Sequence, residues 1–146
     1  MTEQSEYQLE DSLMAQMQDL GYERVTITTE AALLANLKMQ IVRANQLDQP
    51  LSDNEWKQVI SHLGSGSAFE RAKKLRDKFN VKFDDGSSRH IQFFWPNADD
   101  NIWQLSNQIM VDHSSQNGRT SRFDVTILVN GLPLVQIELK RRGGIE

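Results

Sequence analysis

The sequence predicts an α/β fold in which a central mixed sheet is flanked by helices. Apolar residues recur at helical spacing in the first half of the chain, as in Leu9, Leu13 and Met17. The second half carries short runs of β-branched and aromatic residues separated by polar turns. Asn130-Gly131 divides the last of these runs into two, and this dipeptide is typical of a β-hairpin turn.

Length and composition predict one globular domain over residues 1–146. The hydrophobic content of 38% and the charged content of 25% are ordinary for such a domain. No apolar run approaches the ~18–20 residues that a membrane-spanning helix needs. The chain has no cysteine, which excludes a disulfide framework and fits a reducing cytoplasm. We therefore expect a cytoplasmic protein without a membrane segment.

The net charge of −4 constrains any role in DNA binding. A domain that held DNA only through phosphate contacts would be basic. If DNA is the substrate, most of the affinity must come from outside this chain.

Start and stop signals predict four helices. Apolar spacing covers residues 5–20, with Ser5 as the start and Gly21 as the end. Thr29 begins a helix that reaches about Ala44, and Ser52 with Glu55 forms a capping box for a helix that reaches about Leu63. Ser67 begins a basic helix, predicted to end at about Phe79.

Strand signals predict the elements of the sheet. Residues 22–28 form a strand or an extended connection, and residues 81–83 and 91–95 form strands around an Asp-Asp-Gly turn. Residues 102–105 and 108–111 are two further strands, and residues 112–121 form a long polar loop. The final hairpin spans residues 122–140.

Three charged residues interrupt the apolar strands of this final hairpin. They are Asp124, Glu138 and Lys140. Charges in such strands cost free energy unless they are paired or bind a metal ion, so they are candidates for a site. Taken alone, Glu-x-Lys also occurs on exposed strands, where it is a solvated face.

The pairing register decides whether the two carboxylates share one face of the sheet. A plain two-residue loop at Asn130-Gly131 would pair Asp124 with Ile137 and put the carboxylates on opposite faces. We predict a three-residue loop instead, either 129–131 or 130–132, because it places Asp124 diagonal to or directly opposite Glu138. Carboxylates in that relation can share one Mg²⁺.

The whole stretch Phe-Asp-Val-Thr-Ile-Leu-Val-Asn-Gly-Leu-Pro-Leu-Val-Gln-Ile-Glu-Leu-Lys, residues 123–140, closely resembles the nuclease motif of the restriction (R) subunit of type I restriction-modification enzymes, in the PD-(D/E)xK superfamily. The residue before the aspartate is commonly proline in that family and is Phe123 here, a departure that does not affect a ligand. Residues 5–10 and 21–23 resemble the family's first helix and its Gly-Tyr-Glu ending, and Asn107-Gln108 resembles a pair found ahead of the motif.

The resemblance implies a restriction-endonuclease-like core and Mg²⁺-dependent hydrolysis of double-stranded DNA. Asp124, Glu138 and the backbone carbonyl of Leu139 would bind the metal, and Lys140 would stabilise charge or orient the water. The resemblance also favours Glu10 as a helix carboxylate near the metal, although an exposed acidic face explains Glu10 as well. Further basic groups expected near the site, as DNA contacts, are Arg119, Arg122, Arg141 and Arg142.

In the family the next elements are a helix and two ATP-driven motor domains, so we expect the chain to be an N-terminal fragment. ATP would then bind only the full-length subunit, whose partners would be the methylation and specificity subunits. Two other hypotheses remain open. One is a non-catalytic docking module with the same fold. The other is a plain globular domain in which Asp124 and Glu138 lie on opposite faces.

Overall fold

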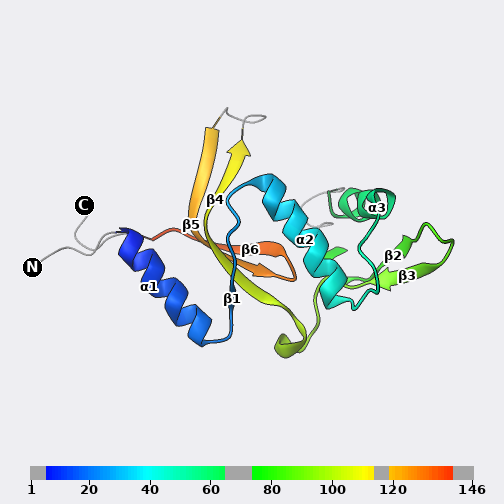
Figure 1. The fold of residues 1–146 in the computed structure, drawn as a ribbon, viewed down its shortest axis with the longest axis horizontal. Helices are drawn as coiled ribbons and strands as arrows, with labels where there is room; N and C mark the ends of the chain where they lie inside the picture. Colours follow the sequence, from blue (N-terminus) through cyan, green and yellow to red (C-terminus); the bar gives the residue numbers. More distant parts are fainter. Residues whose placement is uncertain (1–5, 65–73, 114–118, 140–146) are drawn as a thin grey trace, which may run out of the picture.

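The computed structural model describes residues 6–64, 74–113 and 119–139. Helices precede most of the strands along the chain, and the long strands come last (Figure 1). The elements are α1 (Glu6–Asp19), β1 (Glu23–Arg24), α2 (Glu30–Ala44), α3 (Asp53–Gly64), β2 (Phe79–Lys82), β3 (Ser88–Ile91), the 3₁₀ turn η1 (Ala98–Asp100), β4 (Trp103–His113), β5 (Arg119–Val129) and β6 (Leu132–Ile137).

The main sheet has four strands in the order β1-β4-β5-β6. β1 runs parallel to β4, whereas β4, β5 and β6 are antiparallel neighbours. β2 and β3 form a separate two-stranded sheet. The predicted α/β class with a mixed sheet flanked by helices is therefore confirmed.

Helices α1 and α2 cover opposite faces of the main sheet. On one face, Met14 of α1 packs with Leu105 of β4 and Val125 of β5, and all three are buried. The neighbour of Leu105 in β4, Gln104, bonds instead to Asn36 of α2. Because successive strand residues point to opposite faces, α2 lies on the other side of the sheet from α1.

A closed ring of side-chain hydrogen bonds joins α2 to the sheet. Asn36 donates to Gln104 at 3.0 Å, and Gln104 donates to Glu23 of β1 at 3.0 Å. Arg43 donates to both Glu23 and Gln40 at 3.3 Å, and Gln40 donates to Asn36 at 3.1 Å. Asn36, Gln40 and Gln104 are buried, and each finds a partner within the ring. This satisfied network fixes how α2 sits on β1 and β4.

The predicted starts of two helices are confirmed. The Thr29 hydroxyl accepts from the Ala32 backbone N–H at 3.1 Å and caps α2. At α3, the Ser52 hydroxyl accepts from the Glu55 N–H, and the Glu55 carboxylate accepts from the Ser52 N–H at 2.8 Å. This is the reciprocal pair of a capping box. Ser5 and Ser67, the other two predicted starts, lie outside the described residues.

A second apolar cluster joins α2, α3 and the β2–β3 sheet. Its fully buried members are Ile41 of α2, Val59 of α3, Val81 of β2, Ile91 of β3 and Phe93. The side-chain amide of Gln58 donates to the Lys82 carbonyl at 2.7 Å and accepts from the Lys82 N–H at 2.9 Å. Gln58 therefore occupies the open edge of β2 as a neighbouring strand would.

Several predicted boundaries are wrong. Residues 74–76 are helical, but Phe79 begins β2 instead of ending the helix. The strand predicted over residues 91–95 is shorter and earlier, at Ser88–Ile91. Residues 102–105 and 108–111 belong to one 11-residue strand, β4, and both ends of the predicted polar loop are strand residues. Within the described ranges, every helix is too short or too polar to cross a membrane.

Candidate active site

The β5–β6 hairpin positions the candidate carboxylates, and its turn differs from the prediction. Val129 pairs with Leu132, so the loop has two residues instead of the three we predicted. Asn130 and Gly131 take positive φ values of 52° and 89°, as a tight hairpin turn requires. With regular pairing, this loop would place Asp124 opposite Ile137.

A β-bulge in β6 restores the even register. Leu128 pairs with Pro133, whereas the next residue of β5, Ile127, pairs with Val135. Leu134 is the extra residue and has no partner in β5. Beyond the bulge Val125 pairs with Ile137, so the next position of the register brings Asp124 opposite Glu138. Continued by one position, this register places the two carboxylates on one face, which argues against the hypothesis of opposite faces.

One hydrogen bond continues the pairing past the end of β6. Asp124 Oδ2 accepts from the backbone N–H of Leu139 at 2.7 Å. Asp124 is half-buried and Glu138 is exposed. Neither carboxylate forms an ion pair with a residue in the described ranges. Asp124 Oδ1 and the Glu138 carboxylate therefore remain to bind a ligand, and two such oxygen groups match the hard ligands that Mg²⁺ prefers.

The structure does not bring Glu10 together with Asp124 and Glu138. It lies on α1, is only 3% exposed, and accepts from Asn107 Nδ2 at 2.7 Å. Asn107 pairs with Val125, whose side chain packs against α1. Asp124 precedes Val125 in β5, so strand alternation places it on the other face. Across the described residues, no group of three or more acidic, histidine or cysteine side chains is arranged to hold a metal ion.

The hydrogen bond to Glu10 gives Asn107 a structural role that the sequence did not predict. Its side-chain amide connects the first helix to the middle strand of the sheet, at the pair next to Asp124. Only the resemblance of Asn107-Gln108 to a family pair indicated that this position was special.

The predicted basic residues fall largely outside what the structure describes. Lys140, Arg141 and Arg142 lie beyond residue 139. Arg119 and Arg122 belong to β5, where the structure describes their backbone and pairing. Arg122 comes two residues before Asp124 in β5.

The hairpin is anchored at its turn. Asn130 is 1% exposed, and its side-chain amide donates to the Phe93 carbonyl at 2.6 Å and to Asn101 Oδ1 at 2.9 Å. Its own Oδ1 accepts from the Ile102 N–H at 2.7 Å. These contacts fix the turn end of β5 and β6, so the opposite end of the hairpin carries Asp124 and Glu138 from a rigid base.

Comparison with known proteins decides the family. The model of the family "Type I restriction enzyme R protein N terminus" matches residues 3–146. This chain belongs to that family.

Its relatives carry matching names. It is 42% identical over 150 residues to the type I restriction enzyme SauCOLORF180P endonuclease subunit of Staphylococcus aureus, and 42% identical over 151 residues to the SsaAORF53P endonuclease subunit of Staphylococcus saprophyticus. It is 35% identical over 146 residues to the EcoprrI endonuclease subunit of Escherichia coli. The matches cover 98%, 98% and 96% of this chain but only 15%, 15% and 45% of the relatives.

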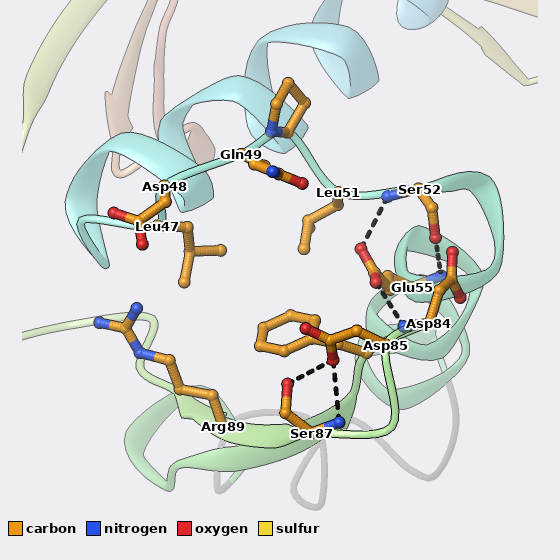
Figure 2. Close-up of a pocket in the computed structure, with 12 residues that line it drawn as sticks. Leu47, Asp48, Gln49, Leu51, Ser52, Glu55, Asp84, Asp85, Ser87 and Arg89 are labelled. Carbon is orange, nitrogen blue, oxygen red and sulfur yellow. Dashed lines mark hydrogen bonds between the residues drawn. The ribbon is translucent and has the colours of Figure 1, made fainter.

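This member of the R-protein family also has a cavity of about 480 Å³ away from the candidate carboxylates. Figure 2 shows it between the α2–α3 connection and the β2–β3 turn. Its acidic lining includes Glu55, but both oxygens of that carboxylate are used, by the N–H groups of Ser52 and Asp84. Asp85 accepts from Ser87 in the turn, which lowers its pKa. These hydrogen bonds show that Glu55 serves to cap α3 and that Asp85 stabilises the β2–β3 turn.

Proposed function

We propose that this chain is the nuclease domain of a type I restriction R subunit and hydrolyses phosphodiester bonds of double-stranded DNA with Mg²⁺. The observation that carries the proposal is the bulged register: continued one position beyond the Val125–Ile137 pair, it puts Asp124 and Glu138 on one face. Family membership and the names of the relatives support it.

Each residue of the site has a defined role in this proposal. Asp124, Glu138 and the Leu139 carbonyl would hold the metal, and Asp124 has Oδ1 available for it because Oδ2 accepts from the Leu139 N–H. A metal held there would supply an acidified water and stabilise negative charge on the phosphate. Lys140 adds a cation beside the reacting phosphate, where such a charge is most effective.

The wider assembly is part of the same proposal. The chain spans about 15% of the length of the staphylococcal relatives, which leaves room for motor domains in a full-length subunit. ATP binds those domains and not this chain. The methylation and specificity subunits are the partners in the cytoplasm, and they supply DNA recognition that a chain of net charge −4 does not.

A non-catalytic docking module is the second candidate. The observation that favours it is that the described residues assemble two carboxylates and no third metal-binding side chain. Glu10, the candidate for that third ligand, is instead bonded to Asn107.

Metal titration separates the two candidates. We expect calorimetry to show Mn²⁺ and Mg²⁺ binding to the folded chain. Asp124→Asn or Glu138→Gln should weaken it by at least the roughly 10–100-fold that loss of an outer-shell partner of a ligand costs, because each removes a ligand charge. Asn at position 124 still accepts from the Leu139 N–H, so the fold is kept. Asp99→Asn removes an equal charge from an exposed carboxylate and is the matched control. A folded wild-type chain that binds neither ion supports the docking module.

A further inference from the structure

A second cavity, of about 300 Å³, lies between the C-terminal end of α2 and β3. Three of its lining residues are basic, and none of the described residues that line it is acidic, although the net charge of the chain is −4. We name it the basic pocket. The residues that give it its chemistry are Gln46, Lys78, Arg89, His90, Gln92 and Trp95. Positive charge gathered in a concave surface favours an anionic ligand.

Hydrogen bonds to the backbone hold the walls of the pocket in place. Asn45, the buried C-cap of α2, donates from Nδ2 to the Gln92 carbonyl at 3.0 Å and accepts at Oδ1 from the Gln92 N–H at 2.9 Å. Asn101 accepts from the Trp95 N–H and donates to the Trp95 carbonyl, both at 2.9 Å. A ligand would therefore meet a pocket whose backbone is already ordered, which lowers the entropic cost of binding.

Arg89 joins the pocket to α2. Its Nη2 donates to the Asn45 carbonyl at 2.6 Å, where a cation also suits the negative end of the helix dipole. This contact uses one of its several N–H donors. Figure 2 shows the guanidinium pointing away from Asp85 and Ser87, and Arg89 forms no ion pair in the described part of the chain. The charge of Arg89 therefore remains available to a ligand.

Lys78 and His90 are neighbours on one face of the β2–β3 sheet. Asn80 pairs with His90, and Lys78 lies two residues before Asn80, so Lys78 and His90 are diagonal to each other. Neither forms an ion pair within the described ranges. Asp77 precedes Lys78 but does not line the pocket, and its charge acts on His62. The helix dipole accounts for Arg89, but no protein group of this kind accounts for Lys78 and His90.

Trp95 adds an aromatic surface beside these basic groups. It is half-buried and lines the pocket together with the amide side chain of Gln46. Proteins bind nucleic-acid backbones with such a combination, because cations and amides contact the phosphate while an aromatic ring packs on a sugar or a base. A volume of about 300 Å³ is at the lower end for ligand sites, so the pocket fits one nucleotide unit of a strand.

The pocket and the candidate carboxylates lie toward opposite ends of the β5–β6 hairpin. At the turn, Asn130 donates to the Phe93 carbonyl and to Asn101, the residue that holds Trp95. Asp124 precedes Asn130 by six residues, which is about 20 Å of strand. Asp124 also lies on the face of the main sheet that α2 covers, and the end of α2 forms one wall of the pocket. One DNA segment of about six base pairs spans that length.

We propose that the basic pocket binds a backbone phosphate of the DNA substrate, about six base pairs from the bond that is cleaved. Lys78, Arg89 and His90 contact the phosphate, and Trp95 packs against the adjoining sugar. A contact of this kind fixes the position of a duplex on the domain without reading its sequence. The distance to the cleaved bond rests on the proposed nuclease function, whereas the phosphate contact itself does not.

Fluorine NMR tests the pocket without involving the metal site. With 5-fluorotryptophan, Trp56, Trp95 and Trp103 each give a signal, which Trp→Phe variants assign. A short duplex is added at low salt in EDTA, so that no cleavage takes place. We expect the Trp95 signal to shift, while Trp56 and Trp103, which do not line the pocket, stay in place. A Trp95 signal that does not move overturns the inference.

Two exposed lysines form a matched pair for the phosphate contact. Lys78→Gln removes a cation of the pocket, whereas Lys82→Gln removes one at the other end of β2, outside it. In fluorescence anisotropy, one lost phosphate contact should reduce the slope of log K against log salt by about 0.9. Lys78→Arg keeps the charge and should restore the slope, and Lys82→Gln should leave it unchanged. Equal slopes for Lys78→Gln and Lys82→Gln contradict the inference.

Free nucleotides carry the same phosphate chemistry, so ATP and inorganic pyrophosphate are titrated separately. We expect the duplex to shift the Trp95 signal at a lower phosphate concentration than either small molecule, because its neighbouring phosphates extend along the domain. Saturation by ATP at a lower phosphate concentration than the duplex would make the pocket a nucleotide site and overturn the assignment to DNA.

A cleavage assay in the assembled restriction enzyme separates this inference from the proposed function. If Glu138→Ala still cuts DNA while the Trp95 signal of the chain responds to the duplex, the active-site proposal fails and the pocket remains a DNA contact. If Glu138→Ala is inactive while Lys78→Gln binds DNA as Lys82→Gln does, only the pocket inference fails.

Discussion

The Asp124 carboxylate accepts a hydrogen bond from the backbone N–H of Leu139 at 2.7 Å. On the other side of Glu138, Ile137 pairs with Val125 in the last step of the β5–β6 ladder. The backbone of Glu138 is therefore fixed at both neighbouring positions, while its own side chain stays exposed. One carboxylate of the candidate site thus positions the other through the backbone.

Removing the charges of the site should abolish DNA cleavage without unfolding the domain. We expect Glu138→Ala and Lys140→Ala, each in the assembled enzyme, to lose cleavage while ATP hydrolysis continues at close to the wild-type rate. Loss of one electrostatic contact to the transition state typically costs about 10²–10³ in rate. Cleavage, ATPase rate and melting temperature should be measured on the same preparations.

Glu138 is exposed and makes no ion pair in the described part of the chain, so its removal should leave the melting temperature unchanged or raise it slightly. Asp99→Ala is the control, since it removes another exposed carboxylate. Near wild-type cleavage by either site variant would show that the site assignment is wrong. A variant that melts below the assay temperature would make its residue structural.

The hairpin shows how far the sequence alone can go. Asn130-Gly131 predicted the place of the turn. The even register was predicted because Asp124 and Glu138 can share a metal ion only if they lie on one face of the sheet. Our prediction of how this register arises was wrong, because we expected a longer loop. The structure instead keeps a two-residue turn and inserts Leu134 as a bulge. Ile137 and Leu139 pack toward Met14 of α1, and this tertiary contact, invisible in local turn chemistry, fixes the register.

The predictions for the polar loop and for Glu10 were also limited by contacts between residues far apart in the sequence. Polar residues at 112–113 and 119–121 predicted a loop, but the β4–β5 ladder continues through them because each strand pairs with the other. Helical spacing correctly placed Glu10 on α1, yet only the packing of α1 shows that its carboxylate meets Asn107 and not Asp124. Caps and periodicity are local signals, whereas these contacts join residues far apart in the sequence.

Thr126→Val should leave stability unchanged or increase it. The Thr126 side chain is 1% exposed, and its hydroxyl has no hydrogen-bond partner among the described residues. An unsatisfied buried hydroxyl costs about 1–3 kcal/mol, and valine fills nearly the same volume without it. Thr29→Val is the control, because that hydroxyl caps α2 and its loss should cost about 1 kcal/mol. Denaturant unfolding measures both, and equal destabilisation by the two variants would contradict the prediction.

His62 should make the domain less stable in mild acid. Its pKa is lowered, first because burial disfavours the charged ring and second because Lys74 repels it. The unfolded chain therefore binds a proton more readily than the folded chain once the pH falls below about 6.5. Stability from this group is present above that pH and is lost as the pH falls toward the lowered pKa of the folded state.

His62→Phe isolates this effect. The histidine ring stacks on Phe79 with centroids 4.0 Å apart, a contact that phenylalanine can keep. The free energy of unfolding should be measured at pH 7.5 and pH 5.5 for both proteins. We expect the wild type to lose more stability on acidification than the variant. Equal losses would mean that His62 does not contribute to the pH dependence.

Gly131 and Gly86 form a matched pair that tests the anchoring of the hairpin. Both have positive φ, 89° and 91°, so alanine strains the backbone similarly at each, by roughly 1–2 kcal/mol. Their surroundings differ. A Cβ at Gly86 would meet nothing within 4 Å, whereas a Cβ at Gly131 would lie 2.7 Å from the Leu37 Cα in the backbone of α2.

Because a helix backbone cannot move aside as a side-chain end can, Gly131→Ala should cost about 1–3 kcal/mol more than Gly86→Ala in denaturant unfolding. Relief of the clash requires the turn to move away from α2, and the turn is the fixed end of the strands that carry Asp124 and Glu138. Gly131→Ala should therefore also weaken Mn²⁺ binding in the calorimetric assay, while Gly86→Ala should not. Equal unfolding free energies for the two variants would show that the turn is free to move and that α2 does not hold the hairpin in place.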